Sequence, residues 1–227
     1  CIRAILATLL RQCIAQLALP TQILMQLMVL QGKKNGGSRT IAILSTMYRP
    51  LMRLLSGDIK DWDVKYAKHW DSALKGNSSL KAHLSRALEL ELADFEGLYT
   101  LHFLWDMGKF YDSIKVTKLI PLLAERGYPI FTMILGLITH KSPRTLVVGP
   151  SCSKPLENCG RRMMAACHQI VSWARGVIYK LVESLGYILP GQICFEHVDD
   201  LTHILTSKSR CGLYHKAFGV GKAVQAG

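Results

Sequence analysis

The chain has 227 residues, which is long enough for one large domain or two small ones with a hydrophobic core. Hydrophobic residues make up 49% of it, and this excludes a disordered tail. Lysine and arginine number 28 against 16 aspartate and glutamate, a net charge of +12. Such a charge favours a polyanionic partner, nucleic acid before an anionic membrane, although a basic solvated surface without a specific partner would carry it too.

The N-terminal residues 1–19, CIRAILATLLRQCIAQLAL, predict an amphipathic helix that Pro20 ends. Arg3 and Arg11 interrupt its apolar run, and no signal-peptide cleavage pattern follows. We therefore expect no stable membrane partner. Because the chain begins at a cysteine and not at methionine, we expect a fragment of a longer protein.

Two apolar segments, 23–30 and 39–44, flank the Gly-rich basic turn GKKNGGS and predict a β-hairpin. A short helix is expected from Ser45 onward. Alternating charges with two tryptophans over 58–75 predict a surface helix, and the apolar spacing over 79–93 predicts another helix.

The second half alternates strands and helices, which is an α+β pattern. LYTLHFLW (98–105) predicts a buried strand that ends in Asp106. The further predictions are helices over 113–126, 130–140 and 161–185, a strand over 144–148, and a strand hairpin over 191–206 with Asp199 and Asp200 at its turn.

Seven cysteines occur without a CxxC pair. An odd count without paired spacing is typical neither of a zinc site nor of a disulfide framework, so we expect an intracellular, reducing compartment, nucleus or cytoplasm. Cys167 and His168 could suggest a ligand or a nucleophile. Their apolar surroundings predict a buried helix, in which a structural role is the more common one.

The adjacent aspartates 199 and 200 stand in the mostly apolar segment CFEHVDDLTH. Neighbouring carboxylates repel each other and resist burial, so they need either water or a cation. If the strand ending in Asp106 lies beside the hairpin, three carboxylates converge. Such oxygen ligands suit Mg²⁺, and two ions about 3.5–4 Å apart can activate an attacking oxygen and stabilise a leaving one. For the aspartate pair alone, a solvated turn is the simpler interpretation.

Five segments stand in an order that resembles a known family. They are MVLQGKKNGGSRTIAIL (28–44), MYRPLMRL (47–54), LWDMGKFYDSI (104–114), ENCGRRMMAACHQIVSWA (157–174) and FEHVDDL (195–201). In this order they resemble the fingers hairpin, the segment after it, the first palm motif, the loop and helix that support template and primer, and the aspartate-pair hairpin. The family is the reverse transcriptases of non-LTR retroelements and group II introns, and the resemblance covers about 20–206.

The resemblance implies an α+β right-hand polymerase fold with fingers and palm, in which the palm is an antiparallel sheet with packed helices. It implies RNA-directed DNA polymerase activity of a retrotransposon type. A DNA primer would be extended with dNTPs on an RNA template by two-metal nucleotidyl transfer, using Mg²⁺ or Mn²⁺. The implied subdomains are an N-terminal helix and fingers over 1–97, a palm over 98–206 with a fingers-like insertion around 113–150, and a remnant over 207–227 that lacks the thumb.

The same resemblance implies roles for single residues. Asp106 and Asp199 would bind both metal ions, with Asp200 assisting. These roles suit phosphoryl transfer, which needs positioning and charge neutralisation more than covalent chemistry.

The nucleotide would be bound by Lys34 and Arg39 at its triphosphate and by Tyr111 under its sugar, where the ring would disfavour a 2′-hydroxyl. Each has a simpler interpretation. Lys34 and Arg39 could be ordinary turn charges, and Tyr111 could be core packing. Asp112 is expected to cap the following helix.

Some features depart from the family pattern. His197 stands where an aromatic residue usually precedes the aspartate pair, and Arg161 and Arg162 crowd the middle motif. Only 27 residues follow Asp200, too few for a thumb. The second hypothesis is therefore an inactive reverse-transcriptase-like remnant that only binds nucleic acid. A basic membrane-associated helical protein is a third, but it leaves the acidic sites unexplained.

Overall fold

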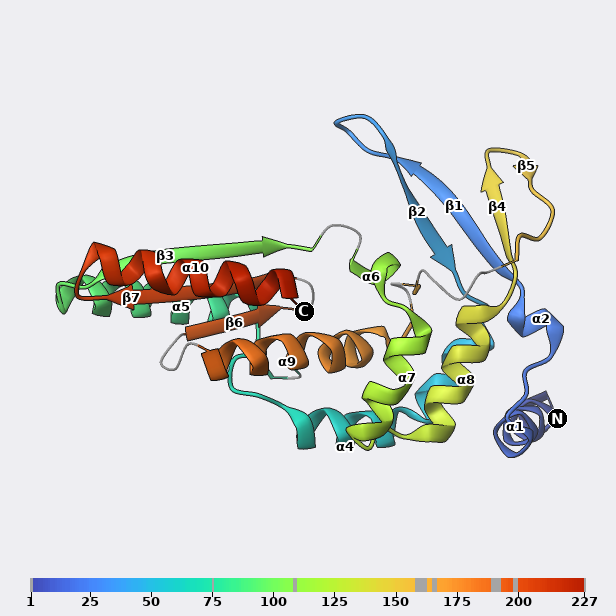
Figure 1. Ribbon diagram of the computed structural model, residues 1–227. Helices are drawn as coiled ribbons and strands as arrows, with labels where there is room; N and C mark the ends of the chain where they lie inside the picture. The colour runs from blue at the N-terminus through green and yellow to red at the C-terminus, as the bar shows by residue number, and fades with distance from the viewer. Residues whose placement is uncertain are drawn as a thin grey trace. The chain divides into compact units, whose positions relative to one another are not determined.

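The computed structural model describes residues 2–74, 76–107, 110–157, 163–164, 167–188, 193–197 and 200–226, and its helices and strands are drawn in Figure 1. In chain order the elements are α1 (Ile2–Gln16), α2 (Thr21–Leu24), β1 (Gln26–Gly32), β2 (Ser38–Ile43), α3 (Tyr48–Leu54), α4 (Ser56–Tyr66), α5 (Ser79–Phe95), β3 (Tyr99–Asp106), α6 (Phe110–Ser113), α7 (Val116–Glu125), α8 (Ile130–Lys141), β4 (Arg144–Val148), β5 (Ser151–Cys152), α9 (Ile170–Ile188), β6 (Ile193–His197), β7 (Asp200–Ser207) and α10 (Arg210–Ala226). The predicted α+β class is confirmed.

The chain forms two compact units, each built from two separate stretches of sequence. Unit 1 comprises residues 1–62 and 111–173, and unit 2 comprises residues 63–110 and 174–227. This division follows spatial contacts and differs from the sequential subdomains 1–97, 98–206 and 207–227, which stay a prediction.

Unit 1 contains a four-stranded sheet in the order β2-β1-β4-β5. β1 and β2 are antiparallel, with Gly32 opposite Ser38, so the predicted hairpin is confirmed. Its first strand begins at Gln26 and not at residue 23, since residues 21–24 form α2. Its turn requires glycine, because Gly36 and Gly37 have φ angles of 83° and 77°, which side chains disfavour. β4 joins the same sheet by pairing parallel with β1 (Figure 1).

The helices of unit 1 pack around side chains that are completely buried, among them Leu51, Leu123 and Leu135. α8 approaches its neighbours closely, since a Cβ added at Gly136 would lie 2.9 Å from the ring of Trp173. This unit therefore has a core of its own.

Two predicted helices differ from the observed ones. The surface helix expected over 58–75 is α4, which ends at Tyr66, and its Trp62 is buried and donates a hydrogen bond to the carbonyl of Arg126 at 2.9 Å. The helix expected over 161–185 begins only at Ile170, because tertiary partners take up backbone N–H groups before it. The N–H of Met163 bonds to the carbonyl of Tyr111 at 2.9 Å, and that of Met164 bonds to His140 Nδ1 at 3.1 Å.

Unit 2 contains a three-stranded antiparallel sheet in the order β3-β7-β6. α10 packs on one face, where Val220 meets Leu205, Phe103 and Trp105. α5 lies against the opposite face, where its Arg86 bonds to Thr202 of β7. Side chains alternate between the two faces of a strand, so Thr202 and Leu205, three residues apart, point to opposite faces. β3 is an edge strand, so the expectation that it is buried is wrong at Leu104, which is 75% exposed.

α10 falls in the segment for which only a truncated remnant was expected. Ser209 caps this helix by accepting a hydrogen bond from the N–H of Gly212 at 3.1 Å, so Ser209 was the available signal. α5, which packs on the sheet as well, is capped in the same way by Ser78, whose side chain accepts a hydrogen bond from the N–H of Lys81.

Candidate functional site

Two aspartates of unit 2 are register partners at one end of its sheet. Asp106 closes β3 and Asp200 opens β7, and the two are Cα partners in the antiparallel register. The next pair along the ladder is Trp105 with Leu201. Side chains directly opposite each other in such a pair have Cβ atoms roughly 4.5–5.5 Å apart. The prediction that the two acidic sites fall on neighbouring strands is confirmed for Asp106 and Asp200.

The hairpin of β6 and β7 brings in the third aspartate by connectivity. His197, at the end of β6, is the Cα partner of Asp200, and Val198 and Asp199 connect the two strands. Asp199 lies outside the described residues, as do the side chains of Asp106, His197 and Asp200. The ligand roles of the three aspartates therefore stay predictions that the backbone register supports.

β7 is a rigid support for this acidic end, since it is the central strand and is buried on both faces. Leu201, Ile204 and Leu205 are each 1% exposed. Apolar residues on both faces of one strand are what a strand between two helical layers requires. A substitution of one of these three residues therefore alters the packing of the core.

A pair of side chains that the sequence did not single out ties β3 to β7 beside the aspartates. Trp105 donates its Nε1–H to Nδ1 of His203 at 2.9 Å, and its ring stacks on Phe103 with centroids 5.6 Å apart. Burial lowers the pKa of His203 to about 4, so the imidazole is neutral at pH 7. Since Nδ1 accepts, the proton lies on Nε2. This contact fixes the residue immediately before Asp106.

The basic hairpin turn lies in unit 1. Lys34 and Arg39 are exposed, and Arg39 donates its Nε–H to the side-chain oxygen of Gln31, its cross-strand partner, at 3.0 Å. This bond uses neither terminal nitrogen of the guanidinium. The turn is closed by backbone bonds from Lys33 to Gly37 and from Gly36 to Lys33. The hairpin thus presents defined basic groups, and their phosphate role stays a prediction.

Tyr111 lies in α6 and is half-buried, so it is not a fully enclosed core residue. Its backbone is fixed by the bond that its carbonyl accepts from Met163. The expectation that Asp112 caps the following helix is wrong, because the N-cap of α7 is Lys115. Asp112 is instead an exposed residue within α6.

The pair Cys167–His168 does not lie in a helix, since both residues precede α9. Cys167 is buried, and its Sγ lies 3.2 Å from the hydroxyl of Tyr48. Burial raises the pKa of Cys167, which keeps the thiol protonated and makes it a poor nucleophile. His168 is exposed. The structural role expected for the cysteine agrees with this environment.

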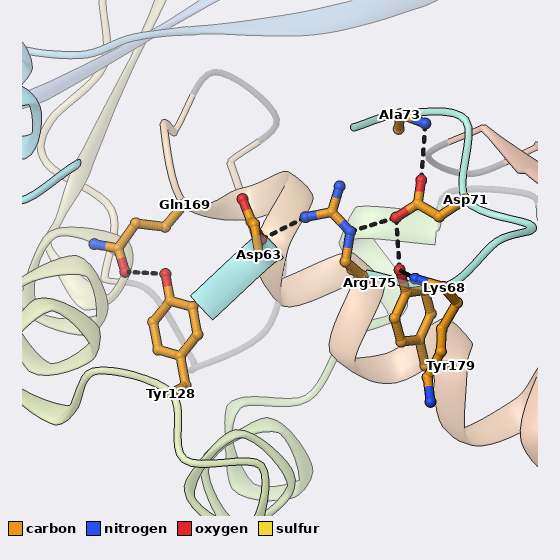
Figure 2. A network of polar contacts seen from close by, with 8 residues as sticks. All are labelled: Asp63, Lys68, Asp71, Ala73, Tyr128, Gln169, Arg175 and Tyr179. Carbon is orange, nitrogen blue, oxygen red and sulfur yellow. Dashed lines mark hydrogen bonds and ion pairs between the residues drawn. The ribbon is translucent and has the colours of Figure 1, made fainter. Parts of the chain in front are cut away.

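A buried ionic network in unit 2 was not predicted. Figure 2 shows Arg175 of α9 between Asp63 and Asp71, with its Nη1 bonded to the first carboxylate and its Nε to the second. Burial lowers the pKa of Arg175, but the charges of Asp71 and Asp63 outweigh this effect and raise it. Asp71 also accepts from the hydroxyl of Tyr179 at 2.8 Å and from the N–H of Ala73 at 2.7 Å.

This network corrects the prediction of a charged surface helix over 58–75, because Asp71 is 1% exposed and Arg175 is 2% exposed. The alternation of charges in this segment gives no sign that its carboxylates point inward. A neutral buried hydrogen bond occurs in unit 1, where Tyr128 donates to the side-chain oxygen of Gln169 at 3.1 Å (Figure 2).

No protein-family model matches the chain, and a search of curated proteins found no match either. Among the described residues no group of three or more His, Cys, Asp or Glu side chains could hold a metal ion, and the side chains of Asp106, Asp199 and Asp200 fall outside that search. In the described part of the chain no helix is long and apolar enough to cross a membrane.

Proposed function

We propose that the chain is the fingers and palm part of an RNA-directed DNA polymerase, which extends a DNA primer on an RNA template. The observation that carries the proposal is the pairing of Asp106 with Asp200 across β3 and β7, with Asp199 preceding Asp200 in the hairpin. The order of the sequence motifs supports it as well. Aspartates at one end of a sheet would supply the oxygen ligands that hard divalent cations take.

Mg²⁺ or Mn²⁺ would supply neutralising charge for the phosphates and for the attacking and leaving oxygens. Asp106 and Asp199 would hold it, with Asp200 assisting. The protein's own contribution is to keep these carboxylates in place before the substrate arrives, which is the part of catalysis that preorganisation provides. The double burial of β7 and the bond between Trp105 and His203 serve this purpose.

Substrate binding is assigned to the basic hairpin and to α6. Arg39 and Lys34 would contact the triphosphate, since guanidinium and ammonium groups bind phosphate oxygens strongly. Tyr111 would lie under the sugar of the incoming nucleotide and exclude a 2′-hydroxyl by its size.

The test is primer extension on an RNA template with Mg²⁺ or Mn²⁺. Asp106→Asn and Asp200→Asn should each lower the extension rate by at least about a hundredfold, because each removes a charge that the transition state requires. Asp112→Asn is the matched control, since it changes an exposed carboxylate six residues after Asp106 and should leave the rate unchanged. Equal rates for all three variants would refute the assignment of the acidic site.

A second candidate function is nucleic-acid binding without turnover. The observation that favours it is His197, which replaces the expected aromatic residue and is the register partner of Asp200. The same preparation distinguishes the two functions. Tight binding of an RNA–DNA duplex that weakens steeply with salt, together with no extension, would establish the binding function alone.

A further inference from the structure

Ala82 and Ala93 of α5 in unit 2 face the sheet, and four of the five leucines of this helix face outward. The side that faces the sheet includes Ala82 and Ala93, which are 7% and 4% exposed, and Arg86, which donates to Thr202 of β7 at 3.0 Å. The outward residues are large and apolar: Leu80 is 76% exposed, Leu84 58%, Leu88 55%, Leu92 51% and Phe95 89%.

The leucines form one continuous stripe, because residues four apart lie next to each other on the helix surface. The stripe lies on the side opposite to Ala82 and Ala93, so this helix exposes an apolar face of the kind that amphipathic helices usually bury. A stripe of this kind exposes an apolar patch on the order of a few hundred Å², which on soluble proteins typically marks an interaction surface.

The charges of α5 are separated along its length. Its exposed charges are Lys81 in the first half and Glu91 and Asp94 in the second half, whereas Arg86 faces the sheet. This order opposes the helix macrodipole, which favours acidic residues near the N-terminus and basic residues near the C-terminus. The charge pattern therefore weakens the isolated helix, and a partner that complements it would compensate for that cost.

We propose that α5 pairs with α5 of a second copy of the chain in antiparallel orientation, forming a dimer with two-fold symmetry. Antiparallel pairing places Lys81 of each helix opposite the acidic half of the other, with Leu84 and Leu88 near the centre of the contact. Parallel pairing would place like charges together. A two-fold contact uses the same surface twice, so a single self-complementary helix is sufficient.

The first test is sedimentation equilibrium over a range of protein concentrations. The native chain should show a reversible monomer–dimer equilibrium, and the double variant Leu84→Asn, Leu88→Asn should raise the dissociation constant roughly tenfold or more. Both leucines are more than half exposed, so the variant should keep its fold and its circular dichroism spectrum. Leu54→Asn on α3, where the leucine is 64% exposed, is the matched control and should leave the equilibrium unchanged.

The second test addresses orientation, through Lys81 and Glu91, whose side chains are both exposed. Lys81→Glu and Glu91→Lys should each weaken self-association, because each places like charges opposite each other in an antiparallel pair. A mixture of the two variants should associate more strongly than either alone, and the double variant should recover dimerisation. Charge variants that behave like the native chain would refute the antiparallel pairing.

A native chain that stays monomeric at every concentration would overturn the proposal. If such a monomer bound vesicles of anionic lipid through Leu84 and Leu88, the face would be a lipid-binding surface instead. Since α5 contains none of the residues assigned to the polymerase site, failure of this proposal and failure of primer extension are separate outcomes.

Discussion

The buried network of unit 2 allows a quantitative test through Asp71→Asn. This change keeps the shape of the side chain and removes its charge, while the Arg175 side chain, 3% exposed, stays buried. Removing one partner of a buried ion pair is strongly destabilising, by about 3–5 kcal/mol, because the remaining charge loses its compensation. The remaining partner, Asp63, has a side chain that is 22% exposed, so water screens part of its attraction.

The measurement is urea unfolding followed by circular dichroism. With a slope of about 2 kcal/mol per molar urea, a loss of 3–5 kcal/mol lowers the midpoint by roughly 1.5–2.5 M. The matched control is Glu183→Gln, which removes the exposed pair between Lys68 and Glu183, where the side chains are 38% and 32% exposed. Exposed pairs of this kind contribute about 0–1 kcal/mol.

The outcome that refutes this reasoning is equal loss of stability in Asp71→Asn and Glu183→Gln. Such a result would mean that Arg175 is not enclosed as the structure shows. A double variant, Asp71→Asn with Arg175→Met, should be more stable than Asp71→Asn alone, since it replaces a buried charge that Asp63 compensates only in part by an apolar side chain of similar length.

Three further predictions concern separate parts of the chain. Burial lowers the pKa of His203 to about 4 and that of His140 to about 3, so these histidines should not affect the free energy of unfolding above pH 6.5. As pH drops from 6.5 toward these values, each histidine should lower that free energy by up to about 1.4 kcal/mol per pH unit. Measuring the free energy of unfolding against pH checks this, and a flat profile contradicts it. Arg39→Ala should raise the KM for dNTP about tenfold or more with little change in kcat, whereas an unchanged KM with loss of folding would remove its phosphate role. Tyr111→Val should shift the ratio of kcat/KM toward ribonucleotides, and an equal loss for both sugars would make Tyr111 a packing residue.

Local signals in the sequence predicted the elements whose cause is local. The turn of the β1–β2 hairpin follows from Gly36 and Gly37, which tolerate positive φ angles, and from the apolar segments on either side. The start of α10 after its cap Ser209 has an equally local cause, and it was missed only because the segment was assigned to a remnant. Adjacency of β3 and the β6–β7 hairpin was also predictable, since few sheet orders fit their sequence.

Features that depend on distant residues could not be predicted in this way. α9 begins at Ile170 because backbone groups before it bond to Tyr111 and His140, which no helix signal in the segment records. Asp71 lies within a charged segment, and only the approach of Arg175, 104 residues later, makes it a buried residue. Helical periodicity over α5 was recognised, but not which of its faces would be covered.

The two acidic groupings of unit 2 differ in how their charge is balanced, and this leads to a last prediction. Arg175 neutralises Asp71 from within the chain, whereas the strands β3, β6 and β7 contain no lysine or arginine. Like charges directly opposite each other in a strand pair destabilise it. Without divalent cations, Asp106→Asn should therefore unfold at a higher temperature than the native chain. Mg²⁺ should stabilise the native chain, by about 1.4 kcal/mol at ten times its dissociation constant, and should have little effect on the variant, so that the order of stability reverses. Thermal unfolding with and without Mg²⁺ measures both effects, and an equal response of the two proteins would show that the aspartates do not bind the ion.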